Sequence, residues 1–266
     1  MFRPSHLFHS FLIRLGAPWA TAGLVTFDFL ALTWDVFIAL PSALLAPGVI
    51  MERFQALVVR STVLVAVTSF ATGAALALQF GEGMSRFGGK LYVPNIVAFA
   101  IVRALGPIFA CLMVAARSGG GVAAEIGSMK ITQQIDALQA LGGQASDKLI
   151  APIVIALALG LPLLTFIADV AGITGGLLAS SSSLSIAPAL YLQKTFESIH
   201  AHDLVVSFFK TAFFGGTIGL IACFHGLRTS AGTAGIGLAT TAAIVAANIF
   251  VLVGDLLITK TLWIFQ

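Results

Sequence analysis

The chain alternates long apolar stretches with short polar ones, a pattern that predicts membrane-spanning helices. Each long stretch exceeds the ~20 residues with which an α-helix crosses ~30 Å of hydrocarbon. The ten-residue alternation of an outer-membrane barrel strand is absent. We expect five spans, at about Leu57–Phe80, Pro94–Ala116, Leu149–Leu178, Leu204–Phe224 and Gly235–Trp263. The sequence therefore predicts an all-α integral membrane protein.

The first 48 residues have a different pattern and form a separate region. Apolar residues recur there at helical spacing, at Phe8, Phe11, Leu12 and Leu15. This spacing is typical of an amphipathic helix that lies in the membrane interface. Asp28 and Asp35 make the stretch from 24 to 40 a poor spanning helix, and Pro41 and Pro47 interrupt the residues after it. We expect an interfacial helix, with a re-entrant continuation as the alternative for residues 20–45.

Composition agrees with a membrane protein. Of 266 residues, 58% are hydrophobic and 9% are charged, whereas a soluble domain carries about 25% charge. The net charge is +3, but the fourteen Lys and Arg residues are scattered, which argues against nucleic-acid binding. Cys111 and Cys223 lie inside apolar runs, and we expect both to be free, buried thiols.

Basic residues indicate the orientation, because short cytoplasmic loops are enriched in them. Placing the loop from 115 to 148 inside the cell puts Arg117, Lys130 and Lys148 in the cytoplasm. The other basic residues that then fall inside are Arg3, Arg14, Arg53, Arg60 and Arg228, and those that fall outside are Arg86, Lys90, Lys194 and Lys260.

A polar, glycine-broken stretch from Ala115 to Gly142 separates the second and third expected spans. The apolar positions that recur there at helical spacing are Ile131, Ile135, Leu138 and Gly142. They predict an amphipathic helix at about 122–142. Such a helix can dock in the groove of a soluble partner or rest on the bilayer, and the pattern alone favours neither.

The loop at 180–203 falls on the outer side, and its middle, Pro188–His200, predicts a short amphipathic helix. His200, His202 and Asp203 could be drawn as a metal site, but a solvated loop end is the better interpretation. Within the spans, small residues recur four positions apart, at Gly172 and Gly176 and at Gly215 and Gly219. This spacing lets helix backbones approach closely.

Motifs for energy conversion are missing. The run GEGMSRFGGKL at 81–91 fails the spacing of a phosphate-binding loop, and Leu91 stands where Ser or Thr is needed. Nor do the spans suggest a Ser-His-Asp or Cys-His arrangement. If the chain works against a gradient, the energy must come from another subunit.

The run GPIFACLMVAARSGGGVAAEIGSMKITQQIDALQALG at 106–142 resembles the signature of the MlaE-type permease family, the membrane subunits of ABC lipid transporters that work with MCE-domain proteins. Supporting matches are ALALQF at 75–80, LPLLTFIADVAGITGG at 161–176, HGLRTSAGTAGIGLATTAAIV at 225–245 and DLLITK at 255–260. The resemblance covers roughly residues 50–262, within a permease domain that we place at 49–266.

The resemblance implies a homodimer of five-span subunits, each with an N-terminal interfacial helix, in the inner membrane of a bacterial cell. It implies a dimer of cytoplasmic ATPases, which bind ATP and Mg²⁺ and grip the loop helix as a coupling helix. It also implies an MCE-domain protein on the outer side and often a STAS-domain regulator on the ATPase. The substrate class is phospholipid or a similar hydrophobic molecule. We expect no cofactor and no catalysis in this chain.

The resemblance also suggests roles for particular residues. The candidates for ATPase coupling are Glu125, Lys130, Gln133, Gln134 and Asp136, and those for the substrate cavity are Leu76, Gln79, Phe80, Arg103 and Pro107. Asp169 and Asp255 are expected to be structural charges within the spans. Many members have a glutamate where this chain has Ala104, and a glutamate where it has Gln133. The chain thus lacks one cavity carboxylate and one charge of the coupling helix.

Arg103 lies midway in the second span, where an isolated charge costs about 2.5–3.5 kcal/mol. It either attracts a lipid phosphate in the cavity or pairs structurally with a carboxylate such as Asp169 or Asp255. Two other functions stay open, namely a permease for a sterol or solvent and a membrane scaffold without transport. Arg103 and Gln79 inside the spans argue against the scaffold.

Overall fold

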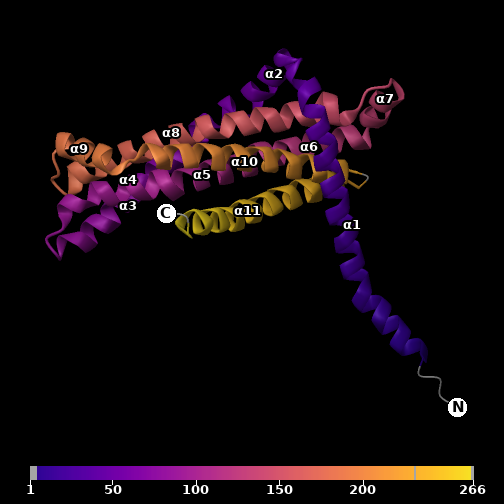
Figure 1. Ribbon diagram of the computed structural model, residues 1–266, viewed down its shortest axis with the longest axis horizontal. Coiled ribbons are helices and arrows are strands. Elements are labelled where there is room, and N and C mark those ends of the chain that lie inside the picture. Colours follow the sequence, from indigo (N-terminus) through magenta and orange to yellow (C-terminus); the bar gives the residue numbers. More distant parts are fainter. Residues whose placement is uncertain (1–4, 231, 265–266) are drawn as a thin grey trace.

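The computed structural model describes the backbone of residues 5–230 and 232–264, and this part of the chain is built from helices (Figure 1). In chain order the elements are α1 (Ser5–Leu44), α2 (Pro47–Leu57), η1 (Val59–Ser61), α3 (Thr62–Ser85), η2 (Lys90–Tyr92), α4 (Val93–Ala100), η3 (Ile101–Leu105), α5 (Gly106–Val114), η4 (Ala115–Gly119), α6 (Gly120–Ile131), α7 (Gln134–Ala140), η5 (Ser146–Ile150), α8 (Ala151–Ser183), α9 (Pro188–Ser198), α10 (Ala201–Leu227) and α11 (Thr233–Ile264).

Six helical stretches of the described chain are long and apolar enough to cross a membrane. They are Val25–Leu44, Pro47–Ser85, Lys90–Ile131, Ser146–Ser183, Ala201–Leu227 and Thr233–Thr261. The last five contain four of the predicted spans in full and the fifth up to Thr261, and the all-α membrane fold is confirmed. The first is the second half of α1, which was not predicted as a span because of its two aspartates.

Helix α1 is continuous through Pro41, where the sequence predicted a break. It runs across the bundle formed by α3, α5, α8, α10 and α11 rather than along it (Figure 1). It packs against η5, α8, α2 and α10. A helix in this direction lies along the membrane surface if the bundle crosses the membrane. The predicted apolar stripe from Phe8 to Leu15 lies outside the described side chains.

Helix α8 is the centre of the bundle, with α3 and α10 packed against it. Glycines permit both contacts. A Cβ on Gly73 of α3 would collide with the carbonyl of Gly172, and a Cβ on Gly215 of α10 would collide with the carbonyl of Leu157. The prediction that Gly172 and Gly215 mark close helix packing is therefore confirmed.

The second span extends much farther than the sequence predicted. The helix that begins at α4 continues through α5 and α6 to Ile131, and two π-helical turns, η3 and η4, interrupt its α geometry. Val122 and Ala123 are fully buried, and α6 packs against α10 and α11. The prediction of a single amphipathic helix at 122–142 is wrong, because the chain forms two helices there, α6 and α7. Its first half belongs to the bundle, and only α7 stands beyond it.

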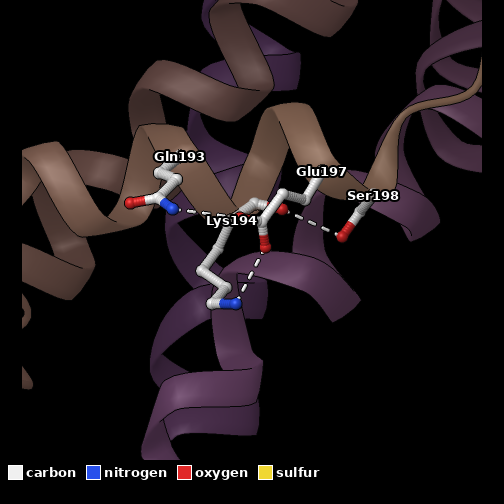
Figure 2. Close-up of polar contacts among 4 residues, drawn as sticks. All are labelled: Gln193, Lys194, Glu197 and Ser198. Carbon is white, nitrogen blue, oxygen red and sulfur yellow. Dashed lines mark hydrogen bonds and ion pairs between the residues drawn. The ribbon is translucent and has the colours of Figure 1, made fainter.

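The loop between α8 and α10 contains α9, which confirms the predicted short helix. Tyr191 and Thr195 of α9 are buried, and α9 packs against α4 and α8. Burial raises the pKa of the Tyr191 hydroxyl. Figure 2 shows the exposed face of α9, where Lys194 donates to a Glu197 oxygen at 2.8 Å and Gln193 donates to the other at 3.1 Å. The Ser198 hydroxyl donates to the carbonyl of Lys194, at 3.0 Å.

Candidate functional site

Arg103 lies in the π-helical turn η3, next to Gly106 and Pro107. Its side chain is 27% exposed, and its guanidinium lies 5.2 Å from the centre of the Phe99 ring. One guanidinium nitrogen lies 4.0 Å from Asp203 Oδ1, at the start of α10. Arg103 thus lies near a carboxylate, as the structural alternative expected, but this carboxylate is that of Asp203 and not that of Asp169 or Asp255.

Lys210 joins three spans at the middle of the bundle. Its side chain is 3% exposed, and its Nζ lies 2.7 Å from Asp255 Oδ1 of α11. The same amine donates a hydrogen bond of 3.2 Å to the backbone carbonyl of Arg103. A buried cation needs a compensating anion and hydrogen-bond acceptors, and Lys210 has both. Asp255 is thus the anion of an interhelical ion pair, which fits its expected structural role.

Asp169 of α8 is buried against the backbone of Gly106, where a Cβ would collide with its carboxylate. A pocket of about 150 Å³ opens beside it, between α8 and α10. The residues that line this pocket are Pro162, Thr165, Phe166, Asp169, Leu204, Ser207 and Phe208. Asp169 therefore belongs to the packing around the Gly106–Pro107 turn, and it also lies within electrostatic reach of Lys210.

The other cavity candidates lie on α3. Leu76 is half-buried and packs against a cluster that includes Val97 and Ile101 of the second span. Gln79 and Phe80 are exposed on the second half of α3. Leu76 is thus brought to the element that carries Arg103, whereas Gln79 and Phe80 face the surroundings of this single chain.

A second polar region lies at the opposite end of the bundle, at the turn between α6 and α7. Gln133 occupies the left-handed region with φ 59°, which reverses the chain after Ile131. Lys130 and Asp136 close the turn through an ion pair of 2.9 Å. Ile135 is buried and fixes α7 to the bundle, while Gln133 and Gln134 are exposed.

An exposed apolar side chain and a groove lie beside this turn. Leu141, just after α7, is 87% exposed. A groove of about 570 Å³ separates α7 from α1. Polar and apolar side chains both line it, among them Leu32, Asp35, Lys130 and Gln139. An exposed leucine beside exposed amides and a mixed groove suits a protein partner better than a lipid tail.

Two further ion pairs tie elements together at this end. Glu125 of α6 accepts from Arg53 of α2 through both carboxylate oxygens, at 2.8 and 3.0 Å. Arg228, at the end of α10, donates to Asp28 of α1 at 3.1 Å. Arg53 and Arg228, both expected inside the cell, thus lie near one end of the bundle. Glu125 already has a partner in its own chain.

Sequence reasoning missed Lys210 altogether and considered Asp203 only as a loop residue. A signal for Lys210 exists, because it is a lone cation in the apolar run VVSFFKTAFFGG of the fourth span. Cys111 and Cys223 are free and buried, as predicted. Among the described residues, no group of three or more His, Cys, Asp or Glu side chains gathers as a metal site.

Comparisons with known proteins agree with these features. Residues 50–261 match the family described as Permease MlaE. A probable ABC transporter permease protein of Rickettsia typhi is 37% identical over 230 residues, which are 85% of this chain and 89% of the relative. A similar protein of Synechocystis is 30% identical over 84% of this chain and 85% of its own length. The chloroplastic protein TRIGALACTOSYLDIACYLGLYCEROL 1 of Arabidopsis thaliana is 31% identical over 73% of this chain and 55% of its own length.

Proposed function

The chain belongs to the MlaE permease family, and we propose that it is the membrane subunit of an ABC transporter that moves phospholipid between the inner membrane and the outer envelope of a bacterial cell. It is a multi-pass membrane protein, and an ABC permease works with a separate ATPase. The main support for a phospholipid cargo is the position of Arg103, which is a partly exposed cation within a span and lies beside an aromatic ring.

A lipid cargo has support from the chloroplast relative, whose name is that of a lipid, trigalactosyldiacylglycerol. A phospholipid has two apolar chains and one anionic phosphate. Arg103 can donate two parallel hydrogen bonds to a phosphate, and such charge-assisted bonds are about twice as strong as neutral ones. Asp203, 4.0 Å away, balances the cation when no phosphate is bound.

The ATPase is proposed to dock at the α6–α7 turn. Gln133, Gln134 and Leu141 are exposed there, and the groove between α7 and α1 offers room for side chains of a partner. Glu125, Lys130 and Asp136 hold the turn in place through ion pairs within this chain. ATP and Mg²⁺ are assigned to the ATPase.

A second copy of the chain, an MCE-domain protein on the outer side and a STAS-domain regulator on the ATPase complete the proposed assembly. An apolar groove of about 610 Å³ between α10 and α11 supports the second copy. Phe213, Phe250 and Leu257 line it, and α11 exposes many large apolar side chains to its surroundings. In the dimer, this apolar face of α10 and α11 packs either against the same face of the second copy or against acyl chains of the lipid.

The proposed mechanism is alternating access. ATP binding draws the two ATPases together and moves the α6–α7 turns. Because α4, α5 and α6 form one continuous helix, motion of the turn is carried along the span to Arg103. The cavity between the two copies opens or closes, and the headgroup is bound or released.

The test uses the native assembly, purified in mild detergent and reconstituted in liposomes with fluorescent phosphatidylethanolamine. We expect ATP-dependent lipid movement, lost in an Arg103→Ala variant that still assembles. Wild-type transfer by that variant would show that Arg103 does not bind the headgroup. Movement of a sterol in place of phospholipid would indicate a different cargo, and ATP hydrolysis without any lipid movement would indicate a scaffold.

A further inference from the structure

Pro107 removes a hydrogen-bond donor from the second span. In an α-helix the carbonyl of Arg103 would accept from the N–H of residue 107, and proline has none. The proline ring also collides with that carbonyl in regular α geometry. The helix adopts the π-helical turn η3 at this point, immediately before Gly106.

Lys210 supplies the donor that Pro107 lacks. Its amine donates to the Arg103 carbonyl at 3.2 Å and pairs with Asp255 at 2.7 Å. A lysine amine has three donors on a flexible stem, so it can serve both partners at once. Lys210 therefore contacts the backbone of Arg103 from a neighbouring helix, and burial holds it there.

We propose that Lys210 is a positioning residue for Arg103, an inference that rests on the proposed headgroup role of that arginine. By fixing the Arg103 carbonyl, Lys210 fixes the π-helical turn and hence the direction in which the guanidinium leaves the helix. The guanidinium then lies over Phe99 and near Asp203, at the side of the span where the headgroup binds. Lys210 itself is buried and does not touch the lipid.

The alternative is that Lys210 only neutralises Asp255. The two roles predict different results when both charges are replaced by apolar side chains of similar size. Such a replacement often preserves stability, because neither member of the Lys210–Asp255 pair is left without its partner. If Lys210 is only a counter-ion, Lys210→Met/Asp255→Leu restores a normal protein. If it positions Arg103, the double variant assembles and still transports poorly.

The experiment compares five forms of the native assembly in the liposome assay with fluorescent phosphatidylethanolamine. They are the wild type, Arg103→Ala, Lys210→Met/Asp255→Leu, the combination of all three changes, and Lys210→Arg. Thr211→Val is the matched control, since the Thr211 hydroxyl donates to carbonyls of its own helix, at Ser207 and Phe208. Yield and thermal midpoint are measured for each.

The double variant should assemble and lose about tenfold in transfer rate, the effect of one lost hydrogen bond to a charged group. When the double change is combined with Arg103→Ala, the transfer rate should fall little further, because the double change and Arg103→Ala both act through the Arg103 guanidinium. Lys210→Arg keeps a charged donor and should recover most of the rate. The control should transfer at the wild-type rate.

Wild-type transfer by the double variant, with Arg103→Ala impaired, overturns the role of Lys210 and leaves the proposed function intact. The role of Lys210 is also overturned if the fold-losses in transfer rate of Arg103→Ala and of the double variant multiply in the combined variant. Wild-type transfer by Arg103→Ala removes the headgroup role and this inference with it. If the double variant does not assemble, Pro107→Ala is added, because alanine restores the backbone N–H. Recovered assembly supports the link to the Arg103 carbonyl, and continued failure contradicts it.

Discussion

The Arg53 guanidinium and the Glu125 carboxylate are joined by two hydrogen bonds, of 2.8 and 3.0 Å, between helices α2 and α6. The two residues are 72 positions apart in the sequence. This pair gives Glu125 a role inside the chain, where the resemblance to transporter permeases had suggested contact with the ATPase.

Glu125→Lys should lower the stability of the purified chain by about 1 kcal/mol, because two cations then face each other at a partly exposed site. The charge exchange Arg53→Glu/Glu125→Lys should restore both the thermal midpoint and co-purification of the ATPase. Restored stability without the ATPase would instead assign Glu125 to the partner surface.

The conformation and the side chain of Gln133 can be tested separately. Its φ of 59° costs a non-glycine residue about 1–2 kcal/mol. Gln133→Gly should therefore raise the thermal midpoint slightly, and it should weaken ATPase binding because the exposed amide is lost. Gln133→Val should lower both the thermal midpoint and the binding of the ATPase. Full ATPase binding by the glycine variant would mean that the shape of the turn is sufficient.

Gly73→Ala tests the contact between α3 and α8. A Cβ at this position collides with backbone, which cannot rearrange as a side chain does, so we expect a loss of at least about 1–3 kcal/mol and a low yield. Gly83→Ala is the matched control on the same helix, because a Cβ there meets nothing within 4 Å. Equal yields of the two variants would contradict the packing described.

The pH dependence of α9 arises from Glu197. Hydrogen bonds from Lys194 and then Gln193 lower the pKa of this carboxyl (Figure 2). Because the pKa is lower in folded α9 than in the unfolded chain, ionisation favours the helix above the usual glutamate range, and this contribution is lost as pH falls through the lowered pKa.

Amide hydrogen exchange across α9 measures this effect. Protection should decline as pH falls below the ordinary glutamate range, and Glu197→Gln should remove that part of the decline. The same pH profile in the wild type and in the variant would show that Glu197 contributes nothing. The backbone amides of α8, the central helix of the bundle, report global unfolding in the same experiment.

Much of the fold could be predicted because apolar length is a local property of the sequence. The five spans and the buried cysteines derive from it, whereas the short helix α9 was predicted from its amphipathic pattern. Helix α6 could not be predicted as part of the bundle, because its run RSGGGVAAEIG reads as polar. Its glycines in fact let neighbours approach, with Gly120 against Ile244 and Gly127 against Thr229.

The candidate site was predicted less completely, because its pairings join residues far apart in the sequence. The hydrogen bond from Lys210 to the Arg103 carbonyl spans 107 positions. Pro107 gave a local sign that this carbonyl needs a donor, and only the structure identifies which residue provides it.

Helix α1 has a consequence for how the protein is made. Its Asp28 binds Arg228, 200 residues later in the chain. At synthesis rates of about 5–20 residues per second, the ribosome takes about 10–40 s to deliver that arginine after Asp28. During this interval α1 has already been translated, but the end of α10, against which it docks, does not yet exist.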